Sequence, residues 1–203
     1  MPGRPSDTLP DFIDPELATL VERVPEGDAW VHEIKLDGYR TGSRIERGNA
    51  RMLTRHANDW TARFRPCMLL AELPAKTAYL DGVIAVLTAE GVSDFGALQE
   101  VLGRHGGSRE MAFIAFDLLY LDGRDPRPLP RIERKATLEK LLAKLPAKSP
   151  VQFSGHVTTQ GPEFFALCMQ AAPGGHHLKA GELALSFRPR WRLGANLFIR
   201  YAE

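Results

Sequence analysis

Apolar residues occur along the chain in two patterns: short runs with strand composition and longer stretches with helical spacing. The short runs predict strands at Trp30–Lys35, Thr41–Arg47, Ala50–Thr54, Ala78–Leu87, Met111–Tyr120 and Val151–Val157. Helical spacing and helix-start signals predict helices at Asp14–Val21, Asp59–Leu73, Asp94–Leu102, Pro130–Leu145 and Pro162–Ala171, although Pro66 interrupts the second of these. Asp122–Asp125 is a predicted turn. Helices interspersed among hairpin-linked strands favour an α+β fold over a doubly wound parallel sheet.

The chain length allows one sizeable hydrophobic core, because 203 residues bury enough surface for one domain with elaborations. Residues 1–10 contain three prolines and small polar residues, which predict an irregular arm. The sequence contains no internal repeat and no low-complexity linker. We therefore expect one principal domain.

The charge is nearly balanced, with 26 Lys and Arg against 25 Asp and Glu and a net charge of +1. A nucleic-acid partner would therefore be held by a local patch and not by a global field. Basic residues cluster at Arg124, Arg127, Arg131, Arg134 and Lys135. A solvated loop and helix start explains that cluster equally well.

The two cysteines, Cys67 and Cys168, lie far apart in the sequence and have no metal-ligand spacing. No charged-then-apolar leader opens the chain, and no apolar run is long enough to span a bilayer. We expect both cysteines to be reduced core residues of a cytoplasmic protein with no membrane partner.

Lys35 lies at the end of a predicted strand and begins the run Lys-Leu-Asp-Gly-Tyr-Arg over residues 35–40. A partly buried lysine with a carboxylate two residues on and a guanidinium five residues on can serve as a nucleophile. The same run also describes an ordinary hairpin end, in which Asp-Gly forms the turn and the lysine is solvated. Taken alone, the run leaves both interpretations open.

Further segments follow Lys35 in the order known from one enzyme family. They are residues 53–55 (Leu-Thr-Arg), 58–61 (Asn-Asp-Trp-Thr), 79–84 (Tyr-Leu-Asp-Gly-Val-Ile), 93–99 (Ser-Asp-Phe-Gly-Ala-Leu-Gln) and 113–120 (Phe-Ile-Ala-Phe-Asp-Leu-Leu-Tyr). With them, the chain resembles the adenylation domain of ATP-dependent DNA ligases over about residues 9 to 172, and closely that of the bacterial end-joining ligases of the ligase D type. Six matches in order favour the nucleophile over the hairpin end.

The resemblance implies a ligase-type nucleotidyltransferase fold, with two mostly antiparallel β-sheets flanked by helices and the nucleotide cleft between the sheets. It also implies that Lys35 attacks the α-phosphate of ATP and becomes a lysyl-AMP. The AMP then passes to a DNA 5′-phosphate, and a 3′-hydroxyl displaces it. Free lysine has a pKa of about 10.4, so burial or adjacent cations must lower the pKa. Mg²⁺ or Mn²⁺ on the triphosphate would assist, with no protein ligand assigned to the metal.

Other roles carry over from the resemblance by position. Glu33 matches the residue that reads the adenine, and Phe116 matches the aromatic residue that packs on the base. Arg40 and Arg55 could supply both cationic neighbours for Lys35 and bidentate contacts to phosphate. Without the family, Phe116 would be a core strand residue, Arg55 a surface charge and Asp37 a turn residue.

The sequence departs from the family pattern at two single positions. Val83 stands where the family has a glutamate that contacts ribose and metal, and Gly155 replaces another usual glutamate. A valine can neither accept a hydrogen bond nor help to bind Mg²⁺. Together the two changes predict impaired activity.

The C-terminal tail departs more strongly. Residues 1–172 resemble the adenylation domain, whereas residues 173–203 diverge, and we see no stretch for the oligonucleotide-binding (OB-fold) domain that follows it in the family. Codons for Pro173–Ala180, read one base later and completed by the first base of the Gly181 codon, permit the family's Leu-Glu-Gly-Ile-Ile-Ser-Lys-Arg. We therefore hypothesise a frameshift just before Pro173, which the nucleotide sequence of the gene tests. Under this hypothesis the tail is not selected for the fold and lacks much of the final strand pair.

These patterns predict an ATP-dependent DNA ligase adenylation domain that takes part in DNA repair and is impaired. The expected partners are ATP, nicked or broken double-stranded DNA, and end-joining repair proteins. Two alternatives stay open: a non-catalytic remnant that binds nucleotide or DNA weakly, and another covalent nucleotidyltransferase of the RNA ligase or capping type.

Overall fold

The computed structural model describes residues 3–6, 8–16, 24, 30–89, 91–103, 111–158, 161–163 and 196–201, with the backbone alone at 65–68 and 196–201. Contacts divide the chain into two compact units. The first unit comprises Met1–Pro15, Gly38–Val86 and Phe95–Phe153. The second unit comprises Glu16–Asp37, Leu87–Asp94 and Ser154–Glu203.

A seven-stranded sheet forms the framework of the first unit. Its strands are β1 (Arg4–Pro5), β3 (Tyr39–Glu46), β4 (Asn49–Thr54), β5 (Thr77–Val86), β6 (Met111–Leu121), β7 (Arg124–Asp125) and β8 (Val151–Phe153). The order is β1-β7-β6-β5-β3-β4, and β8 also pairs with β6. The β6–β8 pair is parallel and the other pairs are antiparallel. The predicted α+β class is confirmed, although the strand predicted at Val151–Val157 ends at Phe153.

Two hairpins of this sheet turn through residues with positive φ. Arg47 and Gly48 join β3 to β4 with φ of 47° and 77°, and Asp122 and Gly123 join β6 to β7 with φ of 45° and 79°. Two successive positive φ angles are the signature of the tight turns that match strand twist, and Asp-Gly is a preferred sequence for them. The predicted turn at residues 122–125 is therefore confirmed for its first two residues, while the last two form β7.

The two helices predicted in the middle of the chain are confirmed as α1 (Phe95–Gly103) and α2 (Arg131–Leu142). The α-helix predicted at Asp59–Leu73 is wrong. That stretch forms two 3₁₀-helices, η1 (Thr61–Arg63) and η2 (Arg65–Glu72). Pro66 lies in the first turn of η2, where its missing N–H is tolerated, and it cannot lie inside one continuous α-helix.

Some predictions fall partly or wholly outside the described residues. Of the helix predicted at Asp14–Val21, residues 14–16 are not helical and residues 17–21 lie outside the described part. Of the helix predicted at Pro162–Ala171, residues 162–163 are helical and the rest lies outside it. The Cys67 side chain, all of Cys168 and residues 173–195 of the tail lie outside it as well.

Both faces of the large sheet are covered by apolar side chains. On one face the main core includes Leu80 and Phe113 from the sheet, Leu98 from α1 and Leu138 from α2. The other face carries a smaller cluster, Leu9, Leu53, Tyr79, Leu119 and Tyr120, against which Phe12 and Ile13 of the N-terminal arm pack. Adjacent strand residues point to opposite faces, which places Tyr79 and Leu80 in different clusters.

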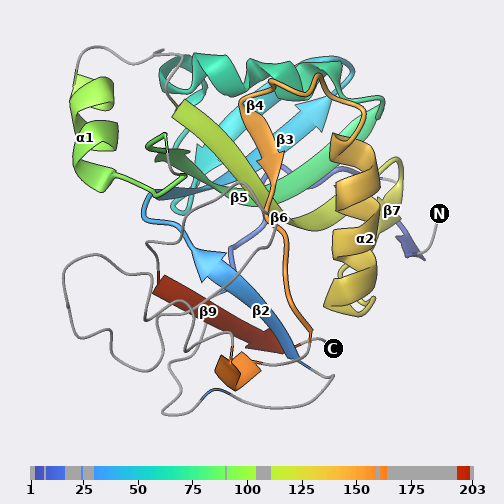
Figure 1. Ribbon diagram of the computed structural model, residues 1–203. Coiled ribbons are helices and arrows are strands. Elements are labelled where there is room, and N and C mark those ends of the chain that lie inside the picture. Colours follow the sequence, from blue (N-terminus) through green and yellow to red (C-terminus); the bar gives the residue numbers. More distant parts are fainter. Residues whose placement is uncertain are drawn as a thin grey trace. The chain divides into compact units, whose positions relative to one another are not determined.

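The second unit contains a two-stranded antiparallel sheet of β2 (Trp30–Lys35) and β9 (Asn196–Tyr201) (Figure 1). Their register runs from Trp30 opposite Tyr201 to Lys35 opposite Asn196. On its other side β2 forms a bridge through His32 to Val157. β9 lies in the divergent tail, where no strand was predicted, although its sequence, Asn-Leu-Phe-Ile-Arg-Tyr, has strand composition.

Candidate active site

Lys35 is the last residue of β2 in the second unit. Its Nζ lies 3.4 Å from Oδ1 of Asp37, and its side chain is 30% exposed. The Asp37 N–H donates a hydrogen bond of 2.9 Å to Oγ of Ser93, which comes from the Ser-Asp-Phe-Gly segment. Two of the segments singled out from the sequence therefore meet here, and their contact fixes the chain just after Lys35.

Gly38 begins the first unit's part of the same run, and its neighbours explain why a glycine occupies the position. A Cβ at residue 38 would lie 2.1 Å from the carbonyl oxygen of Ile84, far inside van der Waals contact. β2 pairs with β9, whereas β3 pairs with β4 and β5, so the run does not close a β2–β3 hairpin. The hairpin interpretation of Lys35 is therefore wrong.

Arg40 is held by a carboxylate and an aromatic ring in the first unit. Its Nε and Nη2 donate hydrogen bonds of 3.2 and 2.6 Å to the two carboxylate oxygens of Asp81. Its guanidinium carbon lies 5.3 Å from the ring centroid of Phe116, within cation–π range. The structure therefore brings together two predicted site residues, Arg40 and Phe116. It also shows a residue that was not predicted for the site, Asp81 on β5, the strand that lies between β3 and β6.

Phe116 owes its position to a β-bulge in β6. Asp81 lies opposite Asp117 and Gly82 lies opposite Ala115, so Phe116 is the extra residue at a register shift between β5 and β6. A Cβ at residue 82 would lie 2.7 Å from the backbone oxygen of Ile114, so the shifted register requires a glycine there. Bulges re-aim side chains and are frequent beside active sites.

Arg55 lies on the exposed surface of the first unit, whereas Glu33 is buried in the second. Arg55 follows β4, where its Nε lies 3.0 Å from Nε2 of His56 on the exposed surface. It lines a hollow of about 10 Å³ that Arg40 also lines, a volume that holds roughly one water molecule. Glu33 lies in β2 of the second unit and is buried, two residues before Lys35 and so on the same side of the strand.

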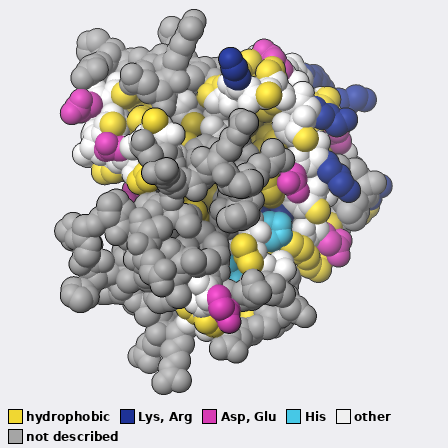
Figure 2. Space-filling view, viewed as in Figure 1, with side chains coloured by type: hydrophobic (Ala, Val, Ile, Leu, Met, Phe, Trp, Pro, Cys, Tyr) yellow, Lys and Arg dark blue, Asp and Glu magenta, His cyan; other side chains and the backbone are white. Residues whose placement is uncertain are grey.

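The basic cluster singled out from the sequence is largely buried. Arg131, Arg134 and Lys135 are 2%, 7% and 0% exposed, so they belong neither to a nucleic-acid patch nor to a solvated helix start. Both interpretations of these three residues are wrong. The Lys and Arg side chains that Figure 2 shows on the surface gather mostly at the right edge of the view.

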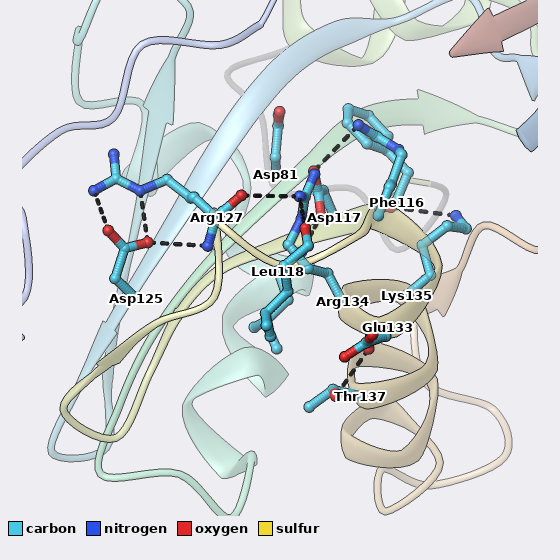
Figure 3. Close-up of polar contacts among 12 residues, drawn as sticks. Asp81, Phe116, Asp117, Leu118, Asp125, Arg127, Glu133, Arg134, Lys135 and Thr137 are labelled. Atoms are coloured by element: carbon cyan, nitrogen blue, oxygen red, sulfur yellow. Dashed lines mark hydrogen bonds and ion pairs between the residues drawn. The ribbon is translucent and has the colours of Figure 1, made fainter. Parts of the chain in front are cut away.

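Asp117 forms ion pairs with two of these buried cations, Arg131 and Arg134. Arg134 donates to both carboxylate oxygens of Asp117 at 2.9 Å (Figure 3). Nη1 of Arg131 lies 3.3 Å from Oδ2 of Asp117. Burial raises the pKa of Asp117, but the charges of Arg131 and Arg134 outweigh burial and hold that pKa below its usual range. Sequence reasoning missed this pairing because an Asp inside an apolar strand and an Arg on a later helix carry no local signal.

A metal site of protein ligands is not found among the described residues, where no group of three His, Cys, Asp or Glu side chains could hold an ion. Val83, at the position of the expected glutamate, pairs with Arg40 across β3 and β5. Mg²⁺ in nucleotide sites is commonly held by one or two carboxylates together with substrate phosphates and water.

Comparison with known proteins decides between the possible families. The sequence matches the family model of the ATP dependent DNA ligase domain over residues 14–172. The chain belongs to this family of ATP-dependent DNA ligase domains. It is 44% identical to the multifunctional non-homologous end joining protein LigD of Pseudomonas aeruginosa over 147 residues. This aligned stretch covers 72% of this chain and 17% of that protein. The bifunctional non-homologous end joining protein LigD of Bacillus subtilis is 33% identical over 149 residues, 63% of this chain and 24% of that protein.

Solved structures agree with this ligase assignment. Mycobacterial DNA ligase D complexed with ATP and MES matches with a TM-score of 0.70 and 26% identity, over 95% of this chain and 55% of that one. The ligase domain of M. tuberculosis LigD matches with a TM-score of 0.68 and 28% identity, over 94% of this chain and 60% of that one. The ligase-type α+β fold and the resemblance to the ligase D type are thus confirmed.

This ligase domain spans less than two thirds of each of these four relatives, from 17% of the Pseudomonas protein to 60% of the M. tuberculosis domain. Among its described helices, none has both the length and the apolar composition needed to cross a membrane.

Proposed function

We propose that this chain is the adenylation domain of a bacterial end-joining DNA ligase and that Lys35 is its nucleophile. The observation that carries the proposal is the position of Lys35 at the end of β2, three residues before a glycine that close packing against Ile84 requires. The family match over residues 14–172, and the ATP in the complex of the mycobacterial relative, support ATP as the substrate.

In the proposed reaction, Nζ of Lys35 loses a proton and attacks the α-phosphorus of ATP. A nitrogen–phosphorus bond forms, the bond from the α-phosphorus to the bridging oxygen breaks, and pyrophosphate leaves. The AMP then passes to the 5′-phosphate of nicked or broken double-stranded DNA, and a 3′-hydroxyl displaces it to close the strand. Nζ lies 3.4 Å from Oδ1 of Asp37, and we propose that this contact is exchanged for the α-phosphate when ATP binds.

The neighbouring residues have proposed roles in holding the nucleotide. Glu33 reads the adenine, Phe116 packs on the base, and Arg40 and Arg55 contact the phosphates. Because Asp81 already accepts two hydrogen bonds from Arg40, we propose that it sets the direction in which the guanidinium presents its other donors. A divalent metal such as Mg²⁺ or Mn²⁺ would supply neutralisation of the triphosphate charge.

We further propose that residues 1–172 form the adenylation domain and that the divergent tail, residues 173–203, and Val83 weaken the first step. A non-catalytic remnant is the second candidate, because Val83 takes the place of the family's metal-site glutamate. The chain retains Lys35, Arg40 and Arg55, which favours the enzyme over the remnant.

The test is incubation with ATP labelled at the α-phosphate, followed by denaturing electrophoresis. We expect label on the wild-type protein and on Lys144→Ala, which removes an exposed lysine, but not on Lys35→Ala. GTP labelled in the same way separates a ligase from a capping enzyme, which would accept it. Absence of label at every concentration of Mg²⁺ or Mn²⁺ would favour the remnant.

A further inference from the structure

The bulge at Phe116 places a backbone carbonyl within hydrogen-bond distance of a side chain from helix α2. Phe116 is the extra residue between Ala115, which lies opposite Gly82, and Asp117, which lies opposite Asp81. An extra residue in a bulge is left out of the regular pairing. Its carbonyl accepts a hydrogen bond of 3.2 Å from Nζ of Lys135, which reaches it from α2 (Figure 3).

Lys135 lies in an unusual place for a lysine. It is 0% exposed, and burial of an ammonium group is costly unless hydrogen bonds or charges compensate for it. Besides the Phe116 carbonyl, its Nζ lies 4.9 Å from the ring centroid of Phe153 in β8, the strand parallel to β6. Lys135 therefore carries a charged donor from α2 to the backbone of β6 at a fully buried position.

Helix α2 contacts the bulge through two consecutive residues. Lys135 donates to the carbonyl of Phe116, and Arg134 donates to both carboxylate oxygens of the next residue, Asp117. Two directional contacts from one helix to adjacent strand residues fix both the position and the rotation of the bulge. On the sheet side, the ring of Phe116 lies against Arg40.

We propose that Lys135 is a positioning residue for nucleotide binding: it ties the bulged Phe116 carbonyl to α2 and so holds the Phe116 ring where it lies on Arg40. The inference rests on the proposed function, because the ring and Arg40 are the groups assigned there to the base and the phosphates. Lys135 acts through Phe116 and does not itself contact the nucleotide. Its loss is therefore expected to weaken ATP binding and to leave the chemical step unchanged.

The test compares Lys135→Met with Lys140→Met. Lys135→Met keeps an unbranched side chain but removes the ammonium donor, and Lys140→Met replaces an exposed lysine on the same helix. Lys135→Arg restores a donor. Hydrogen exchange of the peptide covering β6 measures the bulge without any nucleotide, and ATP binding and lysyl-AMP formation are measured in parallel. Should Lys135→Met fail to fold, Phe116→Leu with the natural Lys135 keeps the inference testable, because it removes the ring and should raise the Kd for ATP by a similar factor.

We expect Lys135→Met to speed exchange in β6, raise the Kd and KM for ATP roughly tenfold and leave kcat within about twofold, with Lys135→Arg closer to wild type. In a Phe116→Leu background the same substitution should change the Kd little, because the ring through which it acts is gone. Exchange no faster than in Lys140→Met, or an unchanged Kd, would overturn the inference. Wild-type protein that binds no ATP would instead overturn the proposed function. The hydrogen-exchange measurement on β6 would still decide whether Lys135 holds the bulge.

Discussion

Arg40 on β3 and Asp81 on β5 form a two-point ion pair, with nitrogen–oxygen distances of 3.2 and 2.6 Å and side chains 19% and 7% exposed. Two parallel hydrogen bonds between a planar guanidinium and a planar carboxylate fix the orientation of the guanidinium as well as stabilising the pair. The pair is part-buried, so solvent screens it less than a surface pair. Arg40 is therefore oriented by the protein before any phosphate arrives.

Asp81→Asn should reduce lysyl-AMP formation by at least about tenfold, because a neutral amide holds the guanidinium of Arg40 less firmly. Asp125→Asn is the matched control, since Asp125 forms the same kind of two-point pair with Arg127, at 2.8 and 2.7 Å, on a more exposed part of the first unit. Rates of label incorporation from ATP at saturating substrate provide the measurement. Equal losses in both variants would show that Asp81 acts through general stability.

Val83→Glu should increase metal-dependent lysyl-AMP formation, by about tenfold if one restored carboxylate contact is gained. Val83 lies directly opposite Arg40 in the β3–β5 register, so a glutamate there would lie beside Arg40 and Asp81. Titration of Mg²⁺ and Mn²⁺ against both proteins checks the metal dependence. A rate for Val83→Glu equal to that of wild type would show that Val83 is not what limits activity.

Gly38→Ala should destabilise the first unit by at least about 2 kcal/mol, because the new Cβ would overlap a backbone carbonyl that cannot move cheaply. Gly103→Ala is the control, since a Cβ at this exposed position at the end of α1 meets nothing within 4 Å. Urea unfolding of both variants gives the free energies. A Gly38→Ala protein as stable as Gly103→Ala would contradict the close approach of residue 38 to Ile84.

Asp117→Asn should lower the free energy of unfolding by about 3–5 kcal/mol at neutral pH, the range for removing one partner of a buried ion pair. Because the pKa of Asp117 is lowered in the folded protein, its contribution is full above about pH 4 and is lost as the pH falls further. The stability of Asp117→Asn should therefore fall less steeply than that of wild type below that pH. Parallel stability curves across that range would contradict the ion pair with Arg131 and Arg134.

The strands and central helices could be predicted from the sequence because their signals are local. Strand composition marks β2 to β6, and Asp122-Gly123 marks a tight turn. The 3₁₀ form of η2 was missed because apolar spacing alone does not distinguish it from an α-helix. The antiparallel pairing of β2 with β9 joins segments more than 160 residues apart, and no local pattern reports such a partner.

The candidate site could be predicted in part. Lys35, Arg40 and Phe116 follow from ordered motifs, and the structure brings Arg40 and Phe116 into contact. The supporting residues Asp81, Arg134 and Lys135 were not assigned, because their roles depend on a bulge in β6 and on the packing of α2. Charge clustering in the sequence gave the wrong interpretation of Arg131, Arg134 and Lys135, since it does not report burial.

The most direct test of the central claim is to map the site of AMP attachment. Purified protein is incubated with ATP and Mg²⁺, digested under neutral conditions, and analysed by mass spectrometry. The account predicts one added AMP on the peptide that contains Lys35, linked to its Nζ, released by acid and absent from Lys35→Ala. AMP found on another residue, or none in a protein that still binds ATP, would contradict Lys35 as the nucleophile.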